Sequence, residues 1–305
     1  MLRRPDRYDY MSLIDRPVIR WPNGARIAFW VVPNIEFYEL DPPGGQGRPI
    51  WPRPQPDVLS YSLRDFGNRV GVWRVIEALS QFKIRASVSL NAAVADHLPD
   101  IVEACLKHEW ELFSHGIYNT RLISGMTDDQ VREVIGDSLA AIKKRSGQDV
   151  VGWLGPAISA TESMFDLLPE FGIKYTIDMV PDDQPVPIKV RSGRLIAMPY
   201  STEINDIRVM GVRGYPPEDW ADMMKACFDQ LYAEGENNGM VCCMPLHPYV
   251  VGQAHRIGAL YNVLEHVSSH DGVWFATGRE ITDHFYAHNY EEALRFSAKK
   301  GKVAQ

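Results

Sequence analysis

Short apolar runs alternate with amphipathic segments along most of the chain. Residues 26–32 are β-branched and aromatic and are bounded by Asn23-Gly24 and Pro33, which predicts a buried strand. Residues 71–82 carry apolar side chains at helical spacing and predict a helix. The same patterns predict strands at 85–90, 111–114, 150–154, 173–177, 194–198, 240–246 and 273–276, and helices at 100–108, 127–145, 159–171, 216–235, 255–269 and from about 278.

Alternation of strands and helices favours an α/β fold with a parallel sheet and helical crossovers. About seven parallel strands in 305 residues indicate an irregular, TIM-like (β/α) barrel. Because no repeat or clean linker interrupts the pattern, residues 1–305 are expected to form a single domain with an irregular N-terminal segment. Residues 41–56 are rich in proline and glycine, and we expect them to form a stiff flap over the pocket of this subunit or of a neighbouring one.

Charge and composition exclude several classes of partner. The chain has 32 Lys plus Arg and 39 Asp plus Glu, a net charge of −7, and no basic block, so a nucleic-acid partner is not expected. The longest apolar run, residues 27–32, is too short for a membrane span, and no secretory signal is visible. We therefore expect a cytoplasmic protein with a small-molecule substrate, and the apolar strand edges favour a homo-oligomer.

Polar side chains follow most of the predicted strands at the point where each ends. In a parallel barrel the catalytic groups lie at these carboxyl ends. Taken singly, each such residue is more often a loop cap or a structural hydrogen-bonding group. Together they are typical of a site that hydrolyses an acyl bond. The candidates are Asn34, Glu36, His115, Trp153, Asp178, Asn205 and His247. Histidines on the predicted helices, among them His266, His270, His284 and His288, are expected to be solvated or capping residues.

The order and spacing of these motifs resemble the polysaccharide deacetylase superfamily, whose fold is an irregular (β/α) barrel. Within it, the chain looks most like the branch of metal-independent allantoinases and cyclic imide hydrolases. The resemblance covers most of the chain and rests on Trp21-Pro22-Asn23-Gly24-Ala25-Arg26-Ile27-Ala28, Asn34-Ile35-Glu36, Gly71-Val72-Trp73-Arg74, Ser114-His115-Gly116, Val151-Gly152-Trp153, Ile196-Ala197-Met198-Pro199-Tyr200, Asn205-Asp206, Leu246-His247, Gly252-Gln253 and Val273-Trp274-Phe275-Ala276.

The chain departs from the metal-dependent members of this superfamily. Where they have an Asp-Asp pair after the first strand, it has Asn34-Ile35-Glu36, and where they have His-x-x-x-His it ends in Asn119. A catalytic zinc site normally has three protein ligands. Glu36 and His115 are only two, so no cofactor is expected. A divalent metal such as zinc on Glu36 and His115, completed by His247 or Glu203, is the alternative.

The resemblance implies hydrolysis of a carbon–nitrogen, non-peptide amide bond in a small, cyclic amide or imide. Glu36 is the expected base or water-orienting carboxylate, and His115 would share the water or polarise the carbonyl. His247 resembles the general acid and Asp178 the acidic partner that orients it. Asn34, Trp153 and Asn205 are expected to hold the substrate. The alternatives are a metal-dependent deacetylase of an N-acetyl sugar and a catalytically inactive binding protein on the same barrel.

Overall fold

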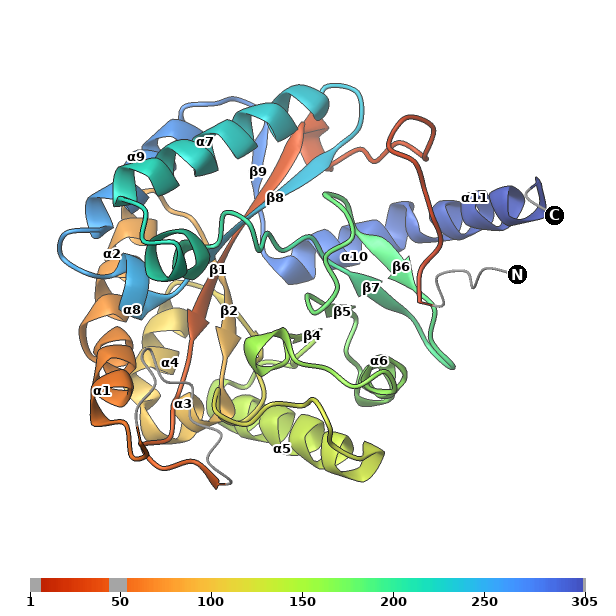
Figure 1. The fold of residues 1–305 in the computed structure, drawn as a ribbon. Helices are drawn as coiled ribbons and strands as arrows, with labels where there is room; N and C mark the ends of the chain where they lie inside the picture. Colours follow the sequence, from red (N-terminus) through yellow and green to blue (C-terminus); the bar gives the residue numbers. More distant parts are fainter. Residues whose placement is uncertain (1–6, 44–53, 304–305) are drawn as a thin grey trace.

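The computed structural model describes residues 7–43 and 54–303, and their strands form one curled, mostly parallel sheet (Figure 1). The strand order is β6-β7-β5-β4-β3-β2-β1-β8, and β9 pairs with the beginning of β1. Among the described residues no ladder joins β8 to β6 or β7, so the barrel is open along that seam. The strands are β1 (Ile27–Ile35), β2 (Ser87–Leu90), β3 (Glu111–Ser114), β4 (Gly152–Trp153), β5 (Tyr175–Thr176), β6 (Val186–Ile188), β7 (Leu195–Ala197), β8 (Met240–Leu246) and β9 (Val273–Phe275).

Most helices cover the outer side of the curled sheet, whereas the two C-terminal helices pack Ile281, Phe285 and Ala293 into its interior (Figure 1). In chain order, the helices are α1 (Val58–Phe66), α2 (Val72–Gln81), α3 (Ala92–His97), α4 (Pro99–Lys107), α5 (Asp128–Ser146), α6 (Met164–Leu167), α7 (Pro217–Glu234), α8 (Pro248–Val251), α9 (Ile257–Ser268), α10 (Gly278–His288) and α11 (Tyr290–Val303). Thr127 caps α5, because its side chain accepts a hydrogen bond from the backbone N–H of Gln130.

The predicted fold class is confirmed, and several elements differ locally, among them the unpredicted helices α1 and α3. β1 continues through Pro33 to Ile35, because the fixed φ of proline is compatible with extended backbone and removes only one donor. Residues 159–171 do not form one helix. The segment contains α6 and a 3₁₀ turn over Leu168–Phe171, which includes Pro169. β6 runs antiparallel to β7 and was not predicted.

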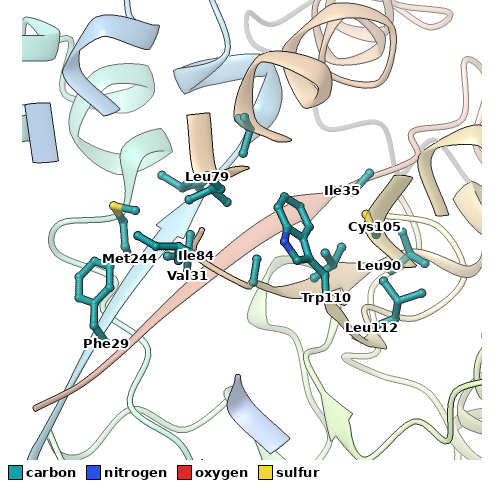
Figure 2. Close-up of a cluster of buried hydrophobic side chains, with 14 of the residues drawn as sticks. Phe29, Val31, Ile35, Leu79, Ile84, Leu90, Cys105, Trp110, Leu112 and Met244 are labelled. Carbon is teal, nitrogen blue, oxygen red and sulfur yellow. The ribbon is translucent and has the colours of Figure 1, made fainter. Parts of the chain in front are cut away.

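Alternate side chains of the strands pack on opposite sides of the sheet. The odd-numbered residues Phe29, Val31 and Ile35 of β1 lie in the outer core between sheet and helices. Figure 2 shows this core, where they cluster with Leu79, Ile84, Leu90, Cys105, Trp110, Leu112 and Met244. The even-numbered residues Ala28, Trp30 and Val32 belong to a second core inside the curl. This two-residue period sets which polar side chains enter the interior at the strand ends.

Two further expectations concern membrane spans and the proline-rich stretch. In the part of the chain that the structure describes, no helix is long and apolar enough to cross a membrane. Most of the proline-rich stretch at 41–56, namely residues 44–53, lies outside the described residues, so its expected packing over the pocket stays a prediction.

Candidate active site

Three candidate residues continue the inward-facing rows of their strands. Each lies an even number of residues beyond side chains of the inner core, and each follows the carboxyl end of its strand. Glu36 continues the row of Trp30 and Val32, His115 that of Phe113, and His247 that of Val241 and Cys243. The alternation of strand side chains therefore brings residues that are distant in the sequence to one point in space.

Glu36 lies at the centre of this group. Its Oε1 is 3.5 Å from Nε2 of His115 and 3.6 Å from Nε2 of His247. Its Oε2 accepts a hydrogen bond of 2.7 Å from the hydroxyl of Tyr38. All three members of the group are buried, with exposed fractions of 7 %, 2 % and 7 % for Glu36, His115 and His247. One carboxylate oxygen is thus held by the protein, and the other faces two imidazoles.

The orientation of His115 is fixed by a backbone carbonyl. Its Nδ1 lies 3.0 Å from the carbonyl oxygen of Leu154. Because a carbonyl can only accept, Nδ1 carries the hydrogen and Nε2 of the neutral ring has the free lone pair. The lone pair is therefore on the nitrogen nearest Glu36, where it can accept a hydrogen bond from a water.

Asp206, rather than Asp178, orients His247. Oδ1 of Asp206 lies 2.7 Å from Nδ1 of the imidazole, and Oδ2 accepts the backbone N–H of His247 at 2.7 Å. Asp206 is fully buried and also accepts the N–H of Ile207. The prediction that Asp178 fills this role is wrong. The chain between residues 178 and 206 includes the β6–β7 hairpin, and its path places Asp206 next to His247.

Asp178 is bound on the opposite side of the site. Its Oδ1 accepts the N–H of Gly155 at 2.8 Å and its Oδ2 accepts the hydroxyl of Thr176 at 2.7 Å. Burial raises the pKa of Asp178 to about 6, although these two hydrogen bonds and the charge of His115 act in the opposite direction. Asp178 therefore influences His115 electrostatically and supports the backbone at Gly155.

The amide groups of Asn34 and Asn205 are engaged by the protein. Both side-chain nitrogens donate to the hydroxyl of Tyr200 at 3.1 Å, and that of Asn34 also contacts the carbonyl of Leu246 at 3.2 Å. Oδ1 of Asn205 accepts the N–H of Ile207. These contacts hold the segments that carry Glu36 and Asp206. Burial, with the nearby charges of Asp206 and Glu36, raises the pKa of Tyr200 well above its usual value, which keeps the hydroxyl neutral.

Trp153 lies away from the site, so the prediction that it holds substrate is wrong. Its side chain is fully buried in the outer core between the sheet and the helices. Its neighbour Leu154 belongs to the inner core. β4 spans only two residues, so there was no alternation from which its inward row could be read.

The sequence placed Asn119 at the second-histidine position of the motif, but it gave no sign of Tyr38 or of the contact between them. Tyr38 is two residues beyond Glu36, and its hydroxyl lies between the Glu36 carboxylate and the side chain of Asn119, 2.6 Å away. Since the hydroxyl donates its only proton to Glu36, it must accept from Asn119, which assigns Nδ2 to this contact. Oδ1 of Asn119 is then a buried acceptor without a hydrogen-bond partner among the described residues.

The donor set around Glu36 does not fit a tightly held catalytic zinc. Glu36 and His115 offer one carboxylate and one imidazole, and the third position of the superfamily motif is the neutral amide of Asn119. His247 is a second imidazole near Glu36, but the ligand atoms of Glu36, His115 and His247 do not all lie within 4.8 Å of one another. In the described ranges, the only three His, Cys, Asp or Glu that meet this distance are elsewhere in the fold. Glu36 and His115 alone fall short of the three protein ligands that catalytic zinc sites use.

Comparisons with known proteins show which family and which solved structures the chain resembles. The sequence profile of the family described as "Polysaccharide deacetylase" matches residues 57–176. The structure superposes on that of a probable polysaccharide deacetylase from Pseudomonas aeruginosa PAO1 with a TM-score of 0.82 and 26% identity, covering 92% of this chain and 98% of that one. Over residues 57–176 in sequence, and over most of its length in fold, the chain is similar to the polysaccharide deacetylases.

Hydrolases that differ in their substrates resemble the chain to a similar degree. The PuuE allantoinase has a TM-score of 0.81 and 26% identity, over 92% of this chain and 99% of that one. A peptidoglycan deacetylase of Helicobacter pylori (strain ATCC 700392 / 26695) is 23% identical, over 77% of this chain and 89% of its own length. The comparisons therefore support a hydrolase that acts on carbon–nitrogen bonds, and they do not distinguish among substrates.

Proposed function

We propose that the protein hydrolyses the carbon–nitrogen bond of a small cyclic amide or imide. The observation that carries the proposal is the position of Oε1 of Glu36, 3.5 Å from Nε2 of His115 and 3.6 Å from Nε2 of His247. A water held between these groups would meet two acceptors, Glu36 and neutral His115, and one potential acid, His247. Such a constellation suits the addition of water to a carbonyl and the protonation of a leaving nitrogen.

The first step is the activation of water. Glu36 accepts a proton as the water oxygen forms a bond to the carbonyl carbon, and His115 accepts the second hydrogen of that water through Nε2. The hydrogen bond from Nδ1 of His115 to Leu154 favours this role over polarisation of the carbonyl, because the neutral ring has no hydrogen on Nε2.

The second step is the departure of nitrogen. His247, in its protonated form, gives the proton on Nε2 to the leaving nitrogen as the carbon–nitrogen bond breaks. Asp206 stabilises the imidazolium and fixes its orientation through Oδ1. A water bridging the 3.6 Å between Glu36 and His247 can then return the proton from the carboxyl group to the imidazole, which restores both groups.

Two features favour a small, activated substrate. Glu36, His115 and His247 are each at most 7 % exposed, which suits a compact ligand better than a polymer that needs an open groove. An imide is a better acyl donor than an acetamide, so its hydrolysis depends less on a Lewis acid. The likeness to the PuuE allantoinase supports a cyclic amide, whereas the family's polysaccharide deacetylases make an N-acetyl sugar the competing substrate.

Steady-state turnover of a substrate panel tests the proposal. Cyclic imides, allantoin and N-acetyl sugars are assayed with and without a chelator, and His247→Ala serves as the control for adventitious hydrolysis. We expect turnover of a cyclic imide or amide that survives the chelator and depends on His247. Hydrolysis of N-acetyl sugars alone, dependent on a divalent metal, would favour the deacetylase. A correctly folded protein that hydrolyses no member of the panel would favour the inactive binding protein.

A further inference from the structure

A cluster of two histidines and one aspartate lies on the outer helices, away from the site at the strand ends. His266 is in the last turn of α9, His270 follows that helix, and Asp229 lies on α7. α7 and α9 run beside each other over the sheet (Figure 1). One ligand atom from each of the three residues lies within 4.8 Å of the others, and no other group of this kind is found in residues 7–43 and 54–303.

We propose that Asp229, His266 and His270 bind a divalent transition-metal ion such as zinc. Two histidines four residues apart on a helix are a frequent pair of zinc ligands. Although α9 ends at Ser268, the rings of His266 and His270 keep this proximity, with centroids 4.8 Å apart. A carboxylate from the neighbouring helix supplies the third ligand. Because the cluster is partly exposed, water can complete four-coordination. The proposal revises the expectation that both histidines are only solvated or capping residues.

The ring of His270 has its free nitrogen available for a metal. Its Nδ1 lies 2.9 Å from the carbonyl oxygen of His266, so this nitrogen carries the hydrogen and Nε2 keeps the lone pair. A hydrogen bond from the second ring nitrogen to a backbone carbonyl is the usual way in which a ligating histidine is oriented. The contact thus selects the tautomer that a metal requires.

Aromatic packing restricts both imidazoles before any metal binds. The ring of His270 has its centroid 5.1 Å from those of Phe228 and Tyr232. The ring of His266 lies 5.9 Å from Phe228 and 4.8 Å from His270. Because the rings are already held, less side-chain entropy is lost on coordination than for histidines on an open surface.

Asp229 and His266 already lie near the separation that two ligands have in a tetrahedral zinc site. Oδ1 of Asp229 lies 2.7 Å from Nε2 of His266. Bonds of about 2.0–2.1 Å to zinc place tetrahedral ligands roughly 3.3 Å apart, so the metal would widen this pair by well under an ångström. A bound ion would replace the hydrogen that now joins the two side chains and would tie α7 to α9.

A second pair of histidines provides a matched control. His284 and His288 on α10 have the same spacing, and their ring centroids are 4.5 Å apart. Nε2 of His284 is 2.9 Å from the carbonyl oxygen of Arg20, to which it donates. No third His, Cys, Asp or Glu joins this pair within the described residues. If spacing alone were enough, both pairs would bind zinc. The proposal requires that only the pair beside Asp229 does so.

The test is calorimetric titration of the metal-stripped protein with zinc chloride, together with melting temperatures with and without zinc. The wild-type protein should bind one zinc at this cluster and melt at a higher temperature in its presence. His266→Ala, His270→Ala and Asp229→Asn should each weaken binding by at least ~10-fold, because even changes in the groups that support a ligand cost that much. His288→Ala should bind as the wild type does.

The same titration on His115→Ala distinguishes zinc bound at the outer cluster from zinc bound at Glu36 and His115. This variant leaves the outer cluster intact and should still bind zinc. Absence of zinc binding in the wild type would overturn the proposal. So would unchanged affinity in His270→Ala and His266→Ala, an equal loss in His288→Ala, or a loss in His115→Ala alone.

Discussion

Asp206 holds His247 at two points, with Oδ1 2.7 Å from the ring Nδ1 and Oδ2 2.7 Å from the backbone nitrogen. The first contact fixes the tautomer and orientation of the imidazole, and the second fixes the position of the backbone where β8 ends. Nε2 is thereby directed to Glu36. The proposed acid is positioned by a fully buried carboxylate from another segment of the chain.

Asp206→Asn should abolish most of the activity. An asparagine has one oxygen and one amide nitrogen, so one of the two donors of His247 would face another donor. We expect kcat to fall about 10²–10⁴-fold with little change in KM, the range found when a general acid–base pair is disabled. Asp178→Asn is the control and should cost much less. An equal loss in the two variants would show that Asp206 has no special role.

Tyr38→Phe should change the pH dependence of the reaction. The hydroxyl donates to Oε2 of Glu36, which favours the charged carboxylate. Without it, the acidic limb of the pH–rate profile should move to higher pH, while kcat on the plateau falls less than about 10-fold. Tyr200→Phe removes a hydroxyl that binds Asn34 and Asn205 and should leave that limb in place. An unmoved limb in Tyr38→Phe would exclude Tyr38 as a positioning residue.

Gly71→Ala should displace the segment that follows His247. A Cβ at Gly71 would lie 2.0 Å from the carbonyl oxygen of Pro248, so the backbone of α8 would have to move. An error of about 1 Å in a catalytic group can cost on the order of 10²-fold in rate. We expect a lower melting temperature and a lower kcat. Gly258→Ala, where a Cβ meets nothing within 4 Å, should leave both unchanged or raise the melting temperature.

Asp178 should make the folded state less stable as the pH rises from about 4 to 6. Its pKa is raised by burial from the ordinary 3.8 to about 6, so in that range the folded protein binds the proton more tightly than the unfolded chain does. At about 1.4 kcal/mol for each pKa unit, the loss is at most ~3 kcal/mol. Urea unfolding of wild type and Asp178→Asn at pH 4.5 and 7.5 measures it. The stability of the variant relative to wild type should increase at the higher pH, and a constant difference would contradict the assignment.

Periodicity and topology were enough to predict which strand ends converge. β1, β3 and β8 each have a clear inward row or a strong apolar run. The parallel arrangement therefore predicts that Glu36, His115 and His247 meet at one edge of the sheet. Gly71 could be recognised as part of a motif, although its reason, the close approach to Pro248, is visible only in three dimensions.

The remaining parts of the site depend on features that no local pattern encodes. Asp178 and Asp206 both follow strands, and the choice between them depends on how the β6–β7 hairpin routes the chain. The sequence predicts Trp153 on the inner side of the sheet, but its side chain lies in the outer core. A strand of two residues gives no alternation from which this could be read. The links among Glu36, Tyr38 and Asn119 join residues up to 83 positions apart through side-chain hydrogen bonds, which sequence spacing does not reveal.

The turnover of a cyclic imide by the chelator-treated, metal-free enzyme tests the central claim most directly. The protein is dialysed against a strong chelator until elemental analysis finds no zinc at either the Glu36 site or the Asp229–His266–His270 cluster, and kcat is measured before and after. The proposed mechanism uses only Glu36, His115 and His247, so kcat should be unchanged. Loss of activity on chelation, with recovery on adding zinc to His270→Ala as well as to the wild type, would contradict it.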